Sequence, residues 1–359
     1  MKNISLPLWT IATPLVAWLA FGGSFLYSGT LVQLVLAACL VGAVLSAVHH
    51  AEVVAHWVGE PFGTLLLALA ITVIEVALIV SIMLSGGPET GALARDTVFA
   101  AIMIILSGIV GICLLVGGIK YKEQTFSLQG VNAGLIALTA IVVLTLLLPN
   151  YTTSQAGPYY TPLQLGFVAI VSLVLYGTFV LVQTVRHRDY FLPADLQEDV
   201  DAHAEVPNRA TAMISLLFLL LSLAIVVILA KSLSGDIERA VVAAGAPKSL
   251  VGIIIAAVVL LPEGLAAYRA ASRNRLQTSL NLALGSALAS IGLTIPAVAI
   301  LSIFGGMHIT LGIDMKSTLL VLLALFTSML SLANGRTNVL QGVVLLLIFA
   351  VYLFTTIAP

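Results

Sequence analysis

Long apolar runs follow one another along almost the whole chain, from Leu6 to the C-terminus, with only brief polar interruptions. A single run of about 18 apolar residues is already a candidate transmembrane helix. Only 9% of the 359 residues are charged, whereas a soluble domain carries roughly 25%. Because lipid offers no hydrogen bonds to an exposed backbone, such runs have to form helices. The sequence therefore predicts an all-α polytopic membrane protein whose surroundings are the lipid bilayer.

Polar breaks and Gly/Pro positions divide these runs into about eleven predicted transmembrane helices. We place them at residues 7–27, 31–48, 62–84, 97–119, 129–149, 162–184, 211–231, 249–268, 279–304, 316–333 and 338–357. Cytoplasmic segments are enriched in Lys and Arg, and a cytoplasmic N-terminus puts ten of the 15 basic residues on that side. We therefore expect the N-terminus to be cytoplasmic and the C-terminus external.

The two halves of the chain share features that predict an internal repeat. Leu163-Gln164 is followed by Tyr176, and Leu340-Gln341 is followed by Tyr352 at nearly the same distance. A repeat of five spanning helices has to re-enter from the opposite face, which gives the inverted-topology pair typical of secondary transporters. We expect an extra N-terminal helix (1–28), a first five-helix repeat (29–185), an acidic cytoplasmic linker (186–210) and a second five-helix repeat (211–359). The linker is either a solvated connection or a collar that gathers cations.

Charge and cysteine content exclude several classes of function. The net charge of −1 gives no basic field for nucleic acid. The two cysteines, Cys39 and Cys113, lie within apolar runs, where a thiol behaves as a small hydrophobe. We expect no nucleic-acid partner and no cofactor.

Two acidic residues lie inside predicted helices, away from the helix ends. Glu75 is close to the middle of the third helix, and Glu263 is in the eighth, between Pro262 and Gly264. An ionised carboxylate at bilayer depth costs about 2.5 to 3.5 kcal/mol on insertion scales, so such residues are rare without a function. The alternative is a protonated Glu that hydrogen-bonds between helices. Because both occupy matching repeat positions, we favour a shared functional site.

A pair of buried carboxylates suits the exchange of a cation for protons. Two close carboxylates in a low dielectric favour retention of a proton, whereas Ca²⁺ takes six to eight oxygen ligands and favours their ionised form. Pro262 also predicts a break in the eighth helix, with freed carbonyl oxygens facing a cavity. Metal and protons would then displace one another at Glu75 and Glu263.

A histidine-rich segment precedes the third helix. His49, Glu52 and His56 have the spacing of one helical face, which suits proton or cation access. The alternative is an ordinary segment at the membrane interface, with its polar residues at the lipid headgroups. We also expect every histidine to lie in a loop or at a helix border.

Six segments together resemble the calcium/cation antiporter superfamily, in its cation/proton exchanger branch, and most closely the bacterial ChaA-type antiporters. They are 59–64 (GEPFGT), 72–75 (TVIE), 117–124 (GGIKYKEQ), 261–265 (LPEGL), 285–293 (GSALASIGL) and 334–338 (NGRTN). The resemblance implies a bacterial inner-membrane antiporter that exports Ca²⁺, Na⁺ or K⁺ against inward proton flow. It also implies that Glu75 and Glu263 are the cation ligands and proton-binding groups.

The sequence departs from typical calcium exchangers beside both glutamates. Ile71-Thr72 and Val259-Leu260 replace the Gly-Asn pairs, and Ala289 stands where a Gln is frequent. Fewer oxygen ligands leave room for monovalent cations. We expect secondary oxygen donors at four hydroxyl side chains, those of Thr72, Ser107, Ser286 and Ser290.

Three functions therefore remain in view. The first is a secondary active cation/proton antiporter that works by alternating access and is not an enzyme. The second is a cation channel without proton coupling, which a paired-Glu inverted repeat also permits. The third, an intramembrane enzyme, would need a nucleophile with a base or a metal triad at membrane depth, and no such set is evident.

Overall fold

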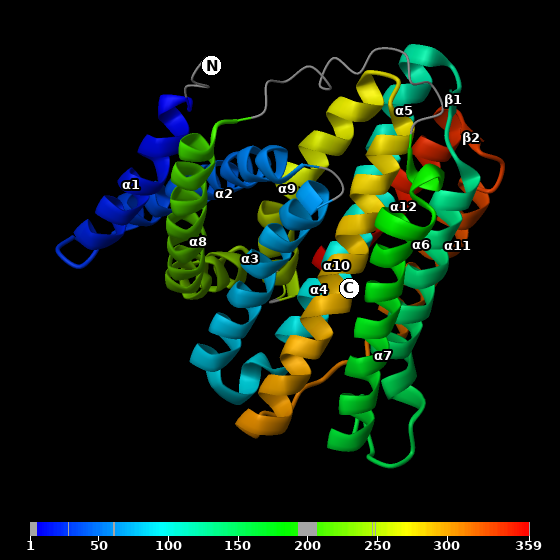
Figure 1. Cartoon of the computed structure of the whole chain (residues 1–359). Helices are drawn as coiled ribbons and strands as arrows, with labels where there is room; N and C mark the ends of the chain where they lie inside the picture. Colours follow the sequence, from blue (N-terminus) through cyan, green and yellow to red (C-terminus); the bar gives the residue numbers. More distant parts are fainter. Residues whose placement is uncertain are drawn as a thin grey trace. The chain divides into compact units, whose positions relative to one another are not determined.

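A computed structural model describes residues 6–27, 29–59, 62–192, 207–245, 247 and 249–358. The chain forms two compact units (Figure 1). Unit 1 comprises Met1–Ile82 and Leu196–Gly245, and unit 2 comprises Met83–Asp195 and Ala246–Pro359. Most of the predicted acidic linker, residues 193–206, lies outside the described residues.

The structure confirms an all-α polytopic membrane protein. Within the described residues, eight helices are long and apolar enough to cross a membrane. Three shorter apolar helices, at Leu8–Gly23, Thr72–Leu84 and Met315–Ser331, correspond to the remaining predicted spans.

Unit 1 is built around the packing of three helices, α1, α2 and α8. Its helices are α1 (Leu8–Gly23), α2 (Thr30–Val58), α8 (Arg209–Ala243) and α3 (Phe62–Gly86), whose last turn belongs to unit 2. The buried face of α8 repeats small and branched side chains such as Ser215, Leu219 and Ser222. Small residues allow close approach of membrane helices, where packing rather than hydrophobicity drives association.

Unit 2 contains the remaining elements. Its helices are η1 (Gly87–Ala92), α4 (Leu93–Met103), η2 (Ile104–Ile109), α5 (Val110–Tyr121), α6 (Leu128–Val142), η3 (Val143–Leu147), η4 (Leu148–Tyr151), α7 (Pro162–Leu181), η5 (Val182–Arg186), η6 (Arg188–Phe191), α9 (Ser249–Ser272), α10 (Leu276–Gly305), α11 (Met315–Ser331) and α12 (Val339–Ile357). The long helix α10 packs against α6, α7 and α9, and α6, α7 and α10 run alongside one another in Figure 1.

Two predicted helices are longer than expected. The second predicted helix, which was placed at 31–48, continues as α2 to Val58, because nothing interrupts it before Gly59, whose φ is +80°. The seventh, placed at 211–231, continues as α8 to Ala243. Its polar extension carries an ion pair between Asp236 and Arg239, three residues apart, the spacing at which helical side chains meet.

Glycines allow a close helix contact in unit 2, between α5 and α12. A Cβ atom on Gly342 would lie 2.4 Å from the backbone nitrogen of Leu115 and 2.9 Å from the carbonyl oxygen of Gly111. A Cβ on Gly118 would lie 2.6 Å from the nitrogen of Val339. The backbones of α5 and α12 therefore touch directly at positions where only glycine fits.

The two helices that suggested the repeat begin in the same way. Thr161 caps α7 in a capping box with Gln164, and Asn338 caps α12 in a capping box with Gln341. Each glutamine side chain accepts a hydrogen bond from the backbone of the cap residue, so unpaired groups at the helix start are satisfied reciprocally. Two short strands, β1 (Gln124–Thr125) and β2 (Arg336–Thr337), pair antiparallel just before α6 and α12.

The two units divide the chain differently from the predicted repeats. Unit 1 takes α2 from the first predicted repeat and α8 from the second, whereas unit 2 takes helices from both. The two units are defined by contacts between residues, whereas a repeat is defined by internal symmetry. The division into units therefore does not test the inverted repeat, which stays a prediction.

Candidate functional site

Glu75 lies in unit 1, on α3, as a buried carboxylate. Its side chain is 5% exposed, and Thr72, one turn earlier, is 4% exposed. The neighbouring Ile74 and Leu78 are also buried, whereas Val73 is exposed. The face of α3 that carries Glu75 and Thr72 is therefore an inward face, in a helix made almost wholly of apolar residues.

Glu263 lies in unit 2, on α9, opposite α10. The Ser286 hydroxyl donates a hydrogen bond to Glu263 Oε1 at 3.2 Å. Ser290 follows one turn later on α10 and is 1% exposed. The structure thus brings together Glu263 and one predicted oxygen donor, Ser286, and buries a second, Ser290, on the same helix.

A π-helical segment, η2, interrupts the run of α4 and α5 next to α9. Ser107 lies within η2, is fully buried and donates to the carbonyl of Met103 at 2.5 Å. A Cβ atom on Gly264, the neighbour of Glu263, would lie 3.3 Å from Ile109 of η2. Isolated π-helical turns occur frequently at functional sites because they offset the side chains of a helix.

The break predicted at Pro262 is wrong, because α9 is continuous from Ser249 to Ser272 with Pro262 inside it. Pro262 still lacks an N–H group, so the carbonyl of Val258 does not receive the α-helical hydrogen bond from the residue four positions later. A departure from α-helical geometry lies instead in η2, which contains the pair Ser107-Gly108 and which we did not predict.

The two glutamates belong to different units, Glu75 to unit 1 and Glu263 to unit 2. A common chamber for both therefore remains a prediction.

The predicted access face lies on a helix, contrary to the expectation that every histidine falls in a loop or at a border. His49, Glu52 and His56 are all in α2, where Glu52 and His56 are exposed and His49 is partly buried. Their role in proton or cation access stays a prediction.

The fully buried histidine of α2 is His50, which sequence reasoning passed over. Its Nε2 atom lies 3.1 Å from the carbonyl oxygen of Thr10, and the Ser46 hydroxyl donates to the same oxygen at 2.6 Å. A carbonyl only accepts, so Nε2 of His50 carries a hydrogen and donates it. The Thr10 carbonyl is available because Pro14, four residues on in α1, has no N–H. That proline was the sequence signal for this cluster.

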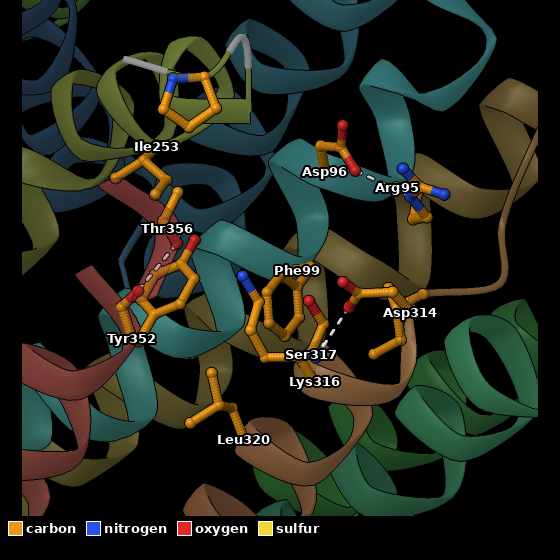
Figure 2. A pocket seen from close by; sticks show the side chains of 12 residues that line it. Arg95, Asp96, Phe99, Ile253, Asp314, Lys316, Ser317, Leu320, Tyr352 and Thr356 are labelled. Carbon is orange, nitrogen blue, oxygen red and sulfur yellow. Dashed lines mark hydrogen bonds and ion pairs between the residues drawn. The ribbon is translucent and has the colours of Figure 1, made fainter. Parts of the chain in front are cut away.

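A cavity of about 210 Å³ lies in unit 2, among the ends of α4, α9, α11 and α12 (Figure 2). Charged and hydroxyl side chains from three of these helices line it: Arg95, Asp96, Asp314, Lys316, Ser317, Tyr352 and Thr356. Phe99 and Tyr352 meet edge-on, with ring centroids 5.4 Å apart. Sequence reasoning treated Asp96 and Asp314 as acids at helix ends and assigned them no role.

These features define a multi-pass membrane protein with carboxylates inside apolar helices. The profile of the Sodium/calcium exchanger protein family matches residues 28–185 and 214–358, and the chain belongs to this family. The resemblance to cation antiporters is thereby confirmed.

Individual relatives agree with this assignment. The chain is 44% identical to the protein y4hA of Sinorhizobium fredii, over 100% of this chain and 98% of the relative. It is 34% identical to the Sodium-potassium/proton antiporter ChaA of Escherichia coli, over 89% and 87% of the two chains. In fold it is similar to the crystal structure of the H⁺/Ca²⁺ exchanger CAX, with a TM-score of 0.73, 18% identity, and coverage of 97% and 88%.

Proposed function

We propose that this protein is a secondary active antiporter that exports Ca²⁺, with Na⁺ and K⁺ as further substrates, in exchange for protons. The observation that carries the proposal is a family of exchangers combined with two carboxylates inside apolar helices, the buried Glu75 and the partly buried Glu263. The Escherichia coli relative is named for sodium, potassium and protons, and the structural neighbour for Ca²⁺ and protons. We place the chain in the bacterial inner membrane, with its N-terminus in the cytoplasm.

The mechanism follows from the chemistry of carboxylates in a low dielectric. With no metal bound, protons neutralise Glu75 and Glu263 and remove the cost of burying charge. A cation that reaches the site makes the ionised form favourable and expels the protons. Ser286 already holds Glu263 Oε1 in position, while Thr72, Ser107 and Ser290 are the further proposed oxygen donors. Alternating access of this site to the two faces then couples the two fluxes.

Flux through everted membrane vesicles tests the proposal. Addition of Ca²⁺, Na⁺ or K⁺ should dissipate a preformed proton gradient if the protein is an antiporter. A channel would conduct the cation without moving protons, and an enzyme would do neither. Absence of cation-dependent proton movement for all three ions, across several pH values, would refute the antiporter.

The Ser286 hydrogen bond gives a graded prediction. Ser286→Ala is expected to lower the apparent cation affinity by roughly 10- to 150-fold, because a hydrogen bond to a charged group contributes about 1.5 to 3 kcal/mol. Ser302→Ala is the matched control, since the Ser302 hydroxyl donates to the carbonyl of Met307 at the far end of the same helix. The measurement is the cation concentration that gives half-maximal exchange. An unchanged value for Ser286→Ala would remove this serine from the site.

A further inference from the structure

The cavity at the ends of α4, α9, α11 and α12 is lined by several side-chain oxygen atoms, apart from those of Glu263 and Ser286. Two carboxylates, of Asp96 and Asp314, and three hydroxyls, of Ser317, Tyr352 and Thr356, line it. Oxygen atoms are the ligands that Ca²⁺ and the alkali cations prefer. The topology predicted from the sequence puts all these helix ends on the external side of the membrane.

The Tyr352 hydroxyl offers the cavity one oxygen atom that no protein group uses among the described residues. Tyr352 is 3% exposed and lines the cavity (Figure 2). Among the residues that the structure describes, its hydroxyl forms no hydrogen bond, although the backbone carbonyl of Tyr352 accepts from Thr356 Oγ1 at 2.8 Å. The Tyr352 residue as a whole is buried, but its hydroxyl opens into the cavity, where it can accept or donate a further hydrogen bond. Water or a hydrated ion in the cavity would satisfy it.

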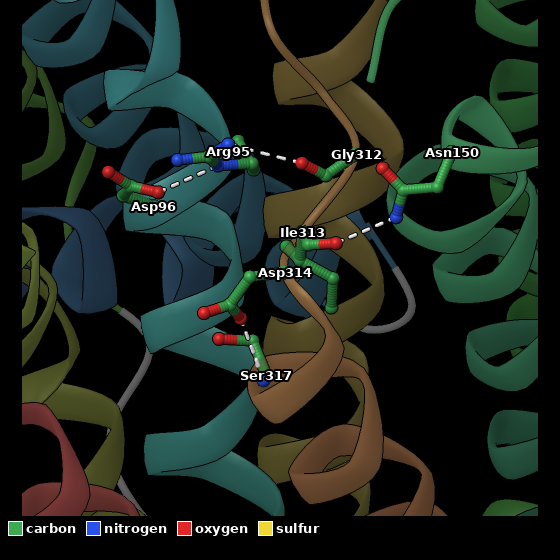
Figure 3. Close-up of polar contacts among 7 residues, drawn as sticks. All are labelled: Arg95, Asp96, Asn150, Gly312, Ile313, Asp314 and Ser317. Atoms are coloured by element: carbon green, nitrogen blue, oxygen red, sulfur yellow. Dashed lines mark hydrogen bonds and ion pairs between the residues drawn. The ribbon is translucent and has the colours of Figure 1, made fainter. Parts of the chain in front are cut away.

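The carboxylates are held in place by the polypeptide around them (Figure 3). Arg95 donates from Nε to Asp96 at 2.8 Å and from Nη1 to the carbonyl of Gly312 at 3.1 Å. Asn150 donates to the carbonyl of Ile313 at 2.7 Å, and this fixes the segment that leads into Asp314. Asp314 in turn caps α11 by accepting from the backbone of Ser317 at 2.8 Å.

The charge balance makes the cavity suitable for weak binding. Arg95 and Lys316 offset Asp96 and Asp314, and the Lys316 ammonium is engaged by the carbonyl of Thr355 at 2.7 Å. The five charged or titratable groups facing the cavity are thus these four and Tyr352. A cation here gains oxygen ligands but little net attraction. Weak binding suits a site along an ion pathway, because a site that binds its ion too tightly does not release it.

We propose that this cavity is a waiting site for a hydrated metal cation, in which Asp96, Asp314 and Tyr352 supply the inner or water-mediated ligands. The proposal rests on the proposed antiporter function, which it extends from the central carboxylates to the route of the ion. Ions released from Glu75 and Glu263, or approaching them, would pause in the cavity on the side of the membrane that carries Asp96 and Asp314.

Terbium luminescence tests the site without reference to exchange. Tb³⁺ occupies oxygen-rich Ca²⁺ sites, and a tyrosine in the site sensitises its emission when excited in the ultraviolet. The full-length purified protein carrying Glu75→Gln and Glu263→Gln is the background, so that the central site does not contribute. We expect tyrosine-sensitised emission that excess Ca²⁺ suppresses.

Three variants locate the signal. Asp96→Asn and Asp314→Asn should each weaken Tb³⁺ binding about tenfold or more, which is the effect of losing 1.4 kcal/mol. Tyr352→Phe should remove most of the tyrosine-sensitised emission. The affinity for Tb³⁺, measured by exciting Tb³⁺ directly, should fall less than in the two Asp variants. Glu123→Gln, which removes an exposed acid outside the cavity, should leave both unchanged.

Three results would overturn the waiting site: no sensitised emission from the background protein, equal emission from it and from both Asp variants, or undiminished sensitised emission from Tyr352→Phe. Because Tyr352→Phe changes only one hydroxyl, it decides the matter even if an Asp variant fails to fold. Failure of the proposed function looks different, since the wild-type protein would then show no exchange in vesicles whatever the luminescence.

Discussion

Glu263→Gln and Glu75→Gln are each expected to abolish cation/proton exchange while leaving the protein folded in the membrane. Glutamine keeps the volume of the side chain but cannot release a proton or contribute a negative charge to a cation. Both residues lie in helices whose ends are set by other features, so insertion should not change. Exchange in everted vesicles and the amount of folded protein in detergent are the two measurements.

Glu123→Gln is the control for this pair, because Glu123 is exposed and lies 3.9 Å from Arg336 outside both units' cores. It should exchange at the wild-type rate. Wild-type exchange by either Glu75→Gln or Glu263→Gln would show that the corresponding carboxylate has no part in the site.

Gly342→Ala is expected to destabilise unit 2 by roughly 1 to 3 kcal/mol, the usual cost of overpacking. Its Cβ would lie 2.4 Å from the nitrogen and 2.8 Å from the Cα of Leu115. These are backbone atoms, so α5 and α12 have to separate for the methyl group to fit. Thermal unfolding of the purified protein in detergent measures the effect.

Gly177→Ala provides the matched control, since a Cβ on this helical glycine would meet nothing within 4 Å. It should be neutral or stabilising by up to about 1 kcal/mol, because alanine favours helix over glycine. Equal unfolding temperatures for the two variants would mean that the contact between α5 and α12 is not tight.

Most of the fold followed from the sequence because lipid leaves the backbone few choices. Apolar runs have to be helices, and Gly and Pro mark their ends. The misjudged ends at Val48 and Lys231 share one cause, which is that polar residues were taken as stops. In α2, however, His50 lies beyond the predicted end and is accommodated inside the helix, where the carbonyl of Thr10 receives its hydrogen bond. Such a partner, 40 residues away in the chain, cannot be read from local composition.

The sequence was enough to predict the two central acids of the candidate site, Glu75 and Glu263. It was not enough to predict the π-helical segment or the cavity residues. Glu75 and Glu263 stood out because charge is rare in apolar helices. The π-helical segment around Ser107 was not predicted, because a single Ser-Gly pair inside an apolar run is common in membrane helices and does not specify a π-helical turn. Asp96 and Asp314 are 218 positions apart by their residue numbers, and only tertiary packing brings them to one cavity.

Proton release on cation binding tests most directly whether protons and metal displace one another at the two central glutamates. Ca²⁺ is added to purified protein in a weakly buffered solution with a pH indicator, and bound Ca²⁺ is measured in parallel. The wild-type protein should release protons as Ca²⁺ binds, and the protein carrying both Glu75→Gln and Glu263→Gln should release none. Ca²⁺ binding by the wild type without proton release, or equal release from the double variant, would contradict the exchange mechanism.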